Sequence, residues 1–465
     1  MKKVIFSLLI IVVIYSAVNY VSDIIVFKQY SNKSKKQFYS ENIDYDVIFL
    51  GLSTVHYGIS PLYLFSNYGL SSYNLSAPGC QYDDLYAISL DAIQNKKTKI
   101  FIVDYLSLMY VGKNAVFSIG NISSVHNPYT RFITYYKDDN LSKSLQNTNL
   151  YYLFHNRWKN ISENDFYTQG YLRGYSSSAN VSKNSISSSD KVFELSDIQK
   201  KQIDDYISLL EKNNVKLILT AMPTMYNHTI YSEAAVNSIK DYIAKYDIEF
   251  ISLKNLDIYN IEKDFQSPVH LNFQGGKKLM NRQDFIPYIM EKYNLKDHRQ
   301  EKEYAQWYKD YEKQERMING KEVKISNNIQ SWWQYSNYDN YTMLISSNGD
   351  NVLNRLPQDI KDKFTSSGLN KFDTDKTNQK YAAIIDDGKV FFEEISDKKV
   401  EYKGRMKNKV NLLVSSENKK ATINVSGKTK AKNRYGINFV IYDKVNREIV
   451  DRIWLDPSNF NQIRR

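Results

Sequence analysis

Residues 46–61 read DVIFLGLSTVHYGISP, an apolar run that ends in a glycine and is followed closely by a serine. The run 46–50 has the length and the aliphatic character of a buried strand. A serine directly after such a strand lies on a tight turn, where its hydroxyl is exposed and its amide can donate to an oxyanion. Gly51 lets the backbone approach a substrate closely. The pattern predicts a strand that presents Ser53 at its carboxyl end, with an N-cap of the following helix as the alternative role for this serine.

Three more buried strands are predicted at 99–103, 215–220 and 248–253, and 195–213 has apolar residues near helical spacing. Strands that alternate with helices indicate a parallel sheet with helices on both faces. The predicted fold class is therefore α/β, with a three-layer parallel-sheet domain. Active sites of such sheets lie at the carboxyl ends of the strands, where Ser53 falls.

A second chemical feature is the stretch HLNFQGG at 270–276, in a chain with only six histidines. His270 stands at the start of a predicted helix and can serve as the general base for Ser53. A purely structural histidine is the alternative. No two histidines have metal-ligand spacing with a carboxylate, so neither a metal nor another cofactor is expected.

These blocks resemble the SGNH/GDSL hydrolase superfamily, and in particular its cell-envelope branch. That branch includes the D-alanyl transfer protein of teichoic acid modification and the alginate-type O-acetyltransferases. The resemblance spans about 44–295 and rests on FLGLS at 49–53, YNLSAPG at 73–79 and HLNFQG at 270–275. It implies an SGNH-type serine acyltransferase or esterase.

The resemblance also implies roles for individual residues. Ser53 would be the nucleophile and His270 its base, and the amides of Ser53 and Gly79 would hold the oxyanion. Three further residues are expected to bind substrate: Asn74, His155 and Arg157.

Two departures from the family pattern affect the predicted site. The family has an Asp three residues before the histidine, where this chain has Ser267, so Asp264 is the candidate third member. An Asp there would stabilise the cationic imidazole, which a serine cannot do. No Gly-x-Asn block follows the second strand, and Asp104 stands at that strand end instead. A dyad, or a binding relic without activity, are the alternatives.

The N-terminal residues 1–26 contain an apolar run, VIFSLLIIVVIYSAVNYV, that is about 27 Å long as a helix and thus near the thickness of a bilayer core. We expect a single-pass signal anchor at the cell membrane, with the rest of the chain extracytoplasmic. Residues 27–43 are Lys/Ser/Asn-rich and are predicted to be a stalk. Residues 105–190 are rich in Asn, Ser and Tyr and are predicted to be an insertion that forms a lid or a substrate wall. The charged stretch 296–318 is predicted to be an exposed linker helix.

The remaining residues, 319–465, carry short β-rich runs separated by turns such as NGD at 348–350. This mixed, β-rich domain resembles an ILEI/PANDER-type domain, through YTMLISS, YAAIIDDGKV and YGINFVIYD. The resemblance implies sugar binding, and a spacer or protein-interaction module is the alternative. The aromatic residues near its start are expected either to stack on sugars or to belong to the core: Trp332, Trp333, Tyr335 and Tyr338.

The predicted function is extracytoplasmic transfer of an acyl group, most simply acetyl, onto a cell-envelope or secreted polysaccharide through acyl-Ser53. Acetyl-CoA is cytoplasmic, so the family resemblance implies a membrane-bound O-acyltransferase as partner. A glycan O-acyl esterase and a catalytically decayed glycan-binding scaffold are the alternatives. The net charge of +11 suits anionic lipid or wall polymers. Nucleic acid is not an expected partner, because no recognisable basic and aromatic module is present.

Overall fold

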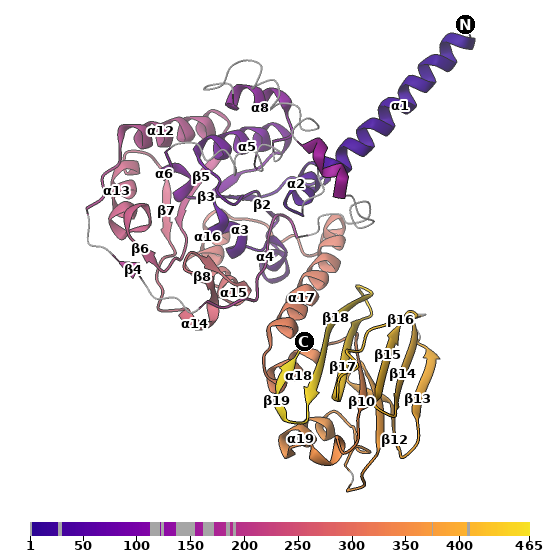
Figure 1. Cartoon of the computed structure of the whole chain (residues 1–465). Helices are drawn as coiled ribbons and strands as arrows, with labels where there is room; N and C mark the ends of the chain where they lie inside the picture. Colours follow the sequence, from indigo (N-terminus) through magenta and orange to yellow (C-terminus); the bar gives the residue numbers. More distant parts are fainter. Residues whose placement is uncertain are drawn as a thin grey trace. The chain divides into compact units, whose positions relative to one another are not determined.

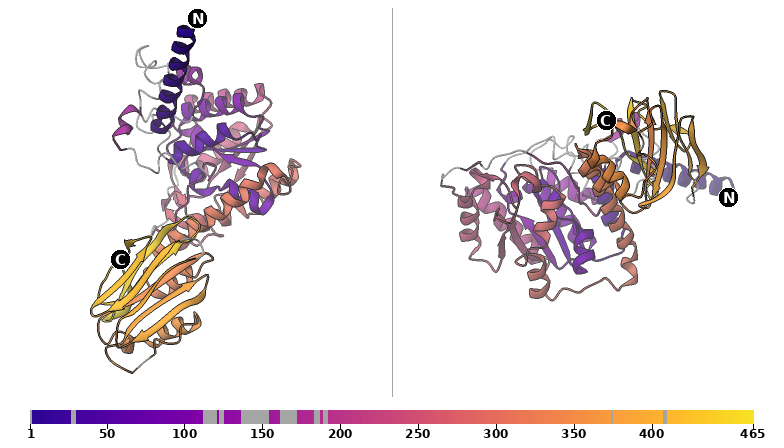
Figure 2. Two further views of the ribbon diagram at one scale, coloured as in Figure 1. Left: turned by 90° about the vertical axis from the view of Figure 1, so that its right-hand side faces the viewer. Right: turned by 90° about the horizontal axis from the view of Figure 1, so that it is seen from below.

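A computed structural model describes residues 2–26, 30–111, 121, 125–135, 154–160, 172–182, 187–188, 192–373, 375–406 and 410–465 (Figures 1 and 2). The chain divides into two compact units, Met1–Gln314 and Glu315–Arg465. Most of the predicted insertion 105–190 lies outside the described residues.

The first unit is built on a five-stranded parallel sheet with the order β2-β1-β3-β5-β7. Its strands are β1 (Val47–Leu50), β2 (Ser72–Asn74), β3 (Ile100–Asp104), β5 (Lys216–Ala221) and β7 (Glu249–Ser252). The predicted strands match four of these to within one or two residues. β1, β3 and β5 are apolar runs that are almost wholly buried, whereas β7, at the edge of the sheet, is only partly buried. The parallel α/β fold is therefore confirmed.

Helices lie on both sides of this sheet (Figure 1). One face packs against α3 (Ser53–Gly58), α4 (Pro61–Tyr68), α15 (Phe273–Met280) and α16 (Ile286–Lys292) in a continuous apolar cluster. On the other side, α5 (Tyr82–Asn95) contacts α12 (Asp197–Lys212), where the Ser89 and Tyr206 hydroxyls share a hydrogen bond. The helix predicted at 195–213 is α12, and it begins with a capping box formed by Ser196 and Gln199.

The apolar N-terminal run lies in α1 (Lys2–Val26), whose described large side chains include the exposed Phe6, Leu9 and Ile11. Among the residues that the structure describes, no helix is both long and apolar enough to cross a membrane. The membrane anchor therefore stays a prediction from the sequence.

The stalk predicted at 27–43 is instead largely a helix packed on the domain, α2 (Tyr30–Ser40). Phe38 is fully buried and stacks on Tyr45, and the Tyr73 hydroxyl donates to the carbonyl of Ser34. Lys35 is also buried. The buried side chains described for α2 are thus one aromatic and two polar ones, and their burial makes α2 part of the first unit.

The helix predicted as an exposed linker is α17 (Ala305–Ile325), and it too is packed. Trp307 is buried against Phe65, with a ring-centroid distance of 5.0 Å. Val323, near the other end of the helix, is part of the core of the second unit. Because most residues of α17 are charged or polar, the sequence did not predict the burial of Trp307 and Val323.

The second unit contains two antiparallel sheets, of order β12-β11-β10-β17-β18-β19 and β13-β14-β15-β16, as its β-rich sequence predicts. The ten strands are β10 (Tyr341–Asn348), β11 (Lys380–Asp386), β12 (Lys389–Ser396), β13 (Val400–Arg405), β14 (Asn411–Glu417), β15 (Lys420–Val425), β16 (Lys428–Thr429), β17 (Gly436–Asp443), β18 (Glu448–Asp456) and β19 (Asn459–Arg464). One apolar cluster joins the two sheets, and another covers the larger sheet with α18 (Ile329–Ser336) and α19 (Gln358–Ser366).

Candidate active site

The turn that carries Ser53 depends on close packing around Gly51. Gly51 has φ +149°, and a Cβ on it would lie 2.7 Å from Val55 Cγ2 and 2.9 Å from Asp104 Cβ. Any larger residue would therefore push α3 away from the end of β3. The chain turns from β1 into α3 within three residues, and Ser53 is the first residue of the helix.

Ser53 and His270 meet at this edge of the sheet, although 217 residues separate them. His270 lies on β9 (His270–Leu271), directly before α15, and its Nε2 is 2.6 Å from Ser53 Oγ. Close approach of α3 and α15 brings them together, since a Cβ on Gly276 would lie only 3.0 Å from the carbonyl oxygen of Gly58. At 2.6 Å from Ser53 Oγ, the Nε2 of His270 can take the proton of the serine hydroxyl.

Ser267 is the second partner of the imidazole. It lies on β8 (Phe265–Ser267), opposite His270 in the β8–β9 hairpin, and its Oγ is 2.8 Å from His270 Nδ1. Burial lowers the pKa of His270, so the neutral ring dominates at pH 7. A neutral ring that accepts from Ser53 at Nε2 carries its proton on Nδ1 and donates it to Ser267.

The structure contradicts Asp264 as the third member. Its carboxylate accepts from Lys278 Nζ at 2.6 Å and from the backbone N–H of Asn260 at 2.6 Å. Asp264 ends the short helix α14 (Ile261–Asp264), whereas the strand after it turns Ser267 toward the histidine. The residue at the usual Asp position is therefore the one that contacts His270.

The predicted oxyanion amides belong to two segments held against β1. The second block is tied to the first by hydrogen bonds from Leu75 N to Phe49 O, at 2.8 Å, and from Ala77 N to Gly51 O, at 3.0 Å. Gly79 follows in a turn with φ +67°, closed by Cys80 N donating to Ala77 O. Within the described residues, no partner is recorded for the amides of Ser53 and Gly79. Their role as oxyanion donors stays a prediction.

Asn74, predicted to bind substrate, has a structural role instead. It is buried, and its Nδ2 donates to the carbonyls of Val55 and Ile59 at 3.0 and 2.8 Å. Its Oδ1 accepts from the backbone N–H of Ser76 at 3.1 Å. These bonds use both hydrogens of the amide, so Asn74 fixes α3 to the second block rather than contacting a ligand.

His155 and Arg157 lie in a 3-10 helix, η1 (His155–Asn160), that contacts α1. Arg157 donates to the carbonyl of Val26 at 2.9 Å and stacks on the ring of Phe154. An arginine at the last carbonyls of a helix satisfies groups that have no intrahelical partner. Arg157 thus contacts the end of α1, and no described contact joins it or His155 to Ser53.

One described part of the insertion, residues 172–182, runs across the site as a strap. It is hydrogen bonded to three functional segments, from Asn74 N to Arg173 O, from Ser176 N to His56 O and from Phe273 N to Ser178 O, each at 3.0–3.1 Å. These bonds link the strap to β2, to α3 and to α15. The role of the insertion as a lid or a substrate wall stays a prediction.

Two further groups beside Ser53 were not singled out in the sequence. His56 is buried on α3, three residues after Ser53, and burial lowers its pKa to about 4, with Lys35 and His270 adding to the effect. Its Nδ1 is buried without a hydrogen-bond partner. Thr54 donates to the Asp104 carboxylate at 2.5 Å. The sequence shows that Ser53 and His56 are three residues apart on one side of a helix, but it does not show that this side is buried at His56.

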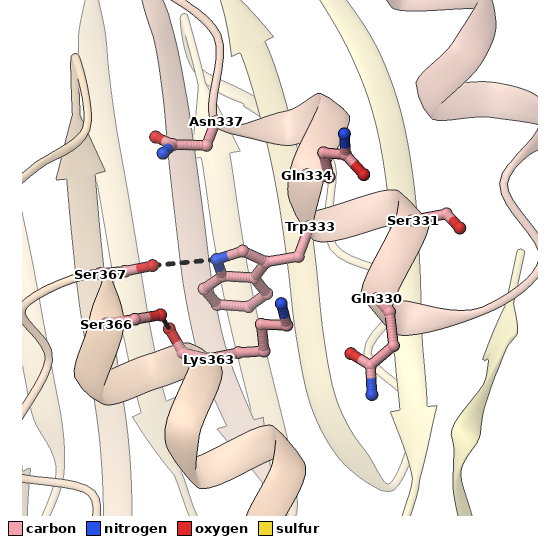
Figure 3. Close-up of a pocket in the computed structure, with 8 residues that line it drawn as sticks. All are labelled: Gln330, Ser331, Trp333, Gln334, Asn337, Lys363, Ser366 and Ser367. Atoms are coloured by element: carbon pink, nitrogen blue, oxygen red, sulfur yellow. Dashed lines mark hydrogen bonds between the residues drawn. The ribbon is translucent and has the colours of Figure 1, made fainter.

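The second unit has a pocket of about 440 Å³ between α18 and α19 (Figure 3), lined mainly by neutral polar side chains: Gln330, Ser331, Trp333, Gln334, Asn337, Lys363, Ser366 and Ser367. Figure 3 shows the Trp333 indole donating to Ser367, at 2.9 Å. Trp332 and Trp333 are buried in the core, and Tyr335 and Tyr338 pack against that core. Both tryptophans thus belong to the core, one of the two expected roles, while Trp333 also lines the pocket. Stacking on sugar faces stays a prediction.

No protein-family model matches the chain, and no curated protein does. A solved structure described as a "putative platelet activating factor from Streptococcus pneumonia" aligns with 12% identity and a TM-score of 0.29, covering 58% of this chain and 92% of that chain. A similarity of this degree carries no argument about fold or activity.

Proposed function

We propose that the first unit is a serine acyltransferase that forms an acyl ester on Ser53 and passes it to a hydroxyl of a cell-envelope or secreted polysaccharide. The observation that carries the proposal is the hydrogen-bonded chain Ser53–His270–Ser267, with distances of 2.6 and 2.8 Å. A hydroxyl, an imidazole and an orienting group in sequence constitute an activated serine nucleophile.

In the proposed reaction, His270 Nε2 takes the proton of Ser53 as Oγ attacks the carbonyl carbon of an acyl donor. A C–O bond forms to Oγ, and the carbonyl oxygen becomes an oxyanion that the amides of Ser53 and Gly79 are proposed to hold. The intermediate then expels the donor's leaving group, which receives the proton from His270. An acceptor hydroxyl repeats the sequence in reverse, giving its proton to His270 and freeing Ser53.

The neutral Ser267 makes this site different from a complete Ser–His–Asp arrangement. Ser267 can accept the Nδ1 proton and so orient the ring, but it offers no charge to stabilise the imidazolium that forms during attack. A slow reaction with weakly activated esters is the expected consequence. The arrangement thus favours an acyl donor with a good leaving group.

The same chemistry with water as the acceptor would make the protein a glycan O-acyl esterase. Water and a sugar hydroxyl would both give their proton to His270. The acceptor that binds therefore decides between esterase and transferase. The proposal places the reaction outside the cell membrane, with residues 1–26 as anchor and a membrane-bound O-acyltransferase as donor partner. These elements derive from the sequence, and the exposed apolar side chains on α1 agree with attachment to a bilayer.

A glycan-binding role for the second unit is favoured by its polar pocket. Amide side chains such as those of Gln334 and Asn337 both donate and accept hydrogen bonds, as sugar hydroxyls do. If the catalytic site is inactive, this unit would make the protein a glycan-binding scaffold. We therefore keep that alternative as the second candidate function.

The proposal is tested with the full chain, p-nitrophenyl acetate and a mixture of oligosaccharides as acceptors. We expect release of p-nitrophenol that is lost in Ser53→Ala and in His270→Gln, with acetylated oligosaccharide as product. Ser66→Ala and His228→Gln are matched controls outside the site and should keep the rate. Turnover that survives in Ser53→Ala contradicts the proposal, and acetate as sole product favours the esterase.

A further inference from the structure

Asp104 lies directly behind the turn that presents Ser53. It is the last residue of β3, is fully buried, and belongs to the strand that pairs with β1. Its Cβ would lie 2.9 Å from a Cβ placed on Gly51. Asp104 therefore packs directly against the turn that carries Ser53.

The carboxylate is joined to the residue that follows Ser53. Oδ2 accepts from Thr54 Oγ1 at 2.5 Å, while Oδ1 lies 3.4 Å from the backbone N–H of Leu106. A hydrogen bond from a fixed carboxyl group limits the movement of the first turn of α3. The position of Ser53 Oγ thus depends on Asp104 through one intervening side chain.

Asp104 acts on the turn and not on the histidine. His270 bonds to Ser53 through Nε2 and to Ser267 through Nδ1, so both of its ring nitrogens already have partners. The two carboxylate oxygens of Asp104 are directed instead at the Thr54 hydroxyl and at the backbone N–H of Leu106. Asp104 is therefore not a displaced third member of the Ser–His pair.

We infer that Asp104 is a positioning residue for the proposed acyl transfer, which holds Ser53 in place through Thr54 and supports the reaction when its carboxyl group is neutral. An anionic Asp104 beside the turn would oppose the negative charge that develops on the acyl carbonyl oxygen near the Ser53 amide. The neutral acid keeps the hydrogen bond to Thr54 without that repulsion. The inference rests on the proposed function.

The surroundings of Asp104 allow its carboxyl group to change between the neutral and the anionic form near neutral pH. Burial raises the pKa of its carboxyl group to about 7, against the lowering effects of Thr54, two backbone amides and Lys254. The phenols of Tyr105 and Tyr231 also face it. Lys254 is engaged elsewhere, since its Nζ donates to Tyr231 O at 2.5 Å and pairs with Glu233 at 3.2 Å. The carboxylate thus has limited compensation for its charge.

The experiment compares kcat/KM between pH 5 and 9 for the full chain and for Asp104→Asn and Thr54→Val, with p-nitrophenyl acetate as substrate. In the unmodified protein we expect kcat/KM to rise as His270 becomes neutral and to fall, roughly tenfold, as pH passes through about 7. Asp104→Asn keeps the shape and removes the charge, so it should abolish the fall above pH 7. Thr54→Val should lower kcat at every pH while leaving the fall in place.

The outcomes separate this inference from the proposed function. If Ser53→Ala abolishes turnover but Asp104→Asn retains the fall above pH 7, or if no such fall exists, the role of Asp104 is wrong and the nucleophile stands. If Asp104→Asn lowers the rate equally at every pH, its role is structural and the inference is wrong. Turnover that does not depend on Ser53, or none in the unmodified protein, overturns both.

Discussion

At the scale of single residues, the site is a serine and a histidine whose third partner is neutral. Ser267 replaces the carboxylate that usually orients such a histidine and bonds to Nδ1 at 2.8 Å. The substitution removes a charge and leaves the geometry of the ring intact. Substitutions of Ser267 should therefore be able to lower or to raise the reaction rate.

Ser267→Ala should lower the rate of Ser53 acylation by roughly 10- to 100-fold, because a hydrogen bond to the developing imidazolium is lost. Ser267→Asp should raise the rate, since a carboxylate stabilises that cation. Stopped-flow release of p-nitrophenol at pH 7.5 measures both. Equal rates in all three proteins would show that Ser267 does not orient His270.

The buried His56 should make the first unit sensitive to acid. Its pKa is lowered to about 4, so the native state excludes the proton that the unfolded chain binds below about pH 6.5. The contribution of His56 therefore reduces stability as pH falls from about 6.5 toward 4. His56→Gln should flatten that part of the stability curve in urea titrations, and His228→Gln, on a less buried side chain, should not. An unchanged slope in His56→Gln would contradict a buried neutral ring.

At the scale of elements, the strands were predictable and the orientation of side chains after them was not. Aliphatic runs at 46–50 and 215–220 identify strands, and the rule that active sites lie at the carboxyl ends of parallel strands places Ser53. His270 reaches Ser53 from the separate β8–β9 hairpin, through the close packing of α15 on α3. Whether Asp264 or Ser267 contacts His270 depends on the β8–β9 pairing, which six residues of sequence do not reveal. Asn74 was misassigned because its amide is used by backbone carbonyls of α3.

The strap at 172–182 depends on Gly174, which has φ +85° and whose Cβ would lie 1.7 Å from the carbonyl oxygen of Asn74. Gly174→Ala should lower the melting temperature of the first unit and reduce esterase activity, because the strap must move away from Asn74 on β2. Gly427→Ala is the control, since Gly427 has φ +78° with no atom within 4 Å. Its cost should be confined to backbone strain, about 1 kcal/mol. Equal effects of the two changes would mean that the strap is not held at Asn74.

At the scale of the whole molecule, the chain has two folded units, and the segment after the apolar helix belongs to the first of them. The sequence of 27–43 looked like a stalk because lysines, serines and asparagines surround its few aromatic residues. Phe38 is nonetheless fully buried against Tyr45 and Tyr73. An average over the composition does not show that one aromatic side chain, Phe38, is buried together with Ser34 and Lys35.

A chain that starts at Tyr30 should therefore keep the fold of the first unit, whereas one that starts at Asn42 should be destabilised. Loss of the buried Phe38 alone corresponds to roughly 3–5 kcal/mol. Phe38→Ala in the full chain checks that the effect comes from this contact. Thermal unfolding monitored by circular dichroism measures all three. Equal stability of the two shortened chains would contradict the packing of α2 and support the stalk prediction.

The most direct test of the central claim is peptide mapping by mass spectrometry after the full chain has reacted with p-nitrophenyl acetate and been quenched in acid. We predict an acetyl group on Ser53, absent from Ser53→Ala and formed far more slowly in His270→Gln. An acetyl group that forms on other residues only, or at equal rates in His270→Gln, would contradict an activated Ser53–His270 pair.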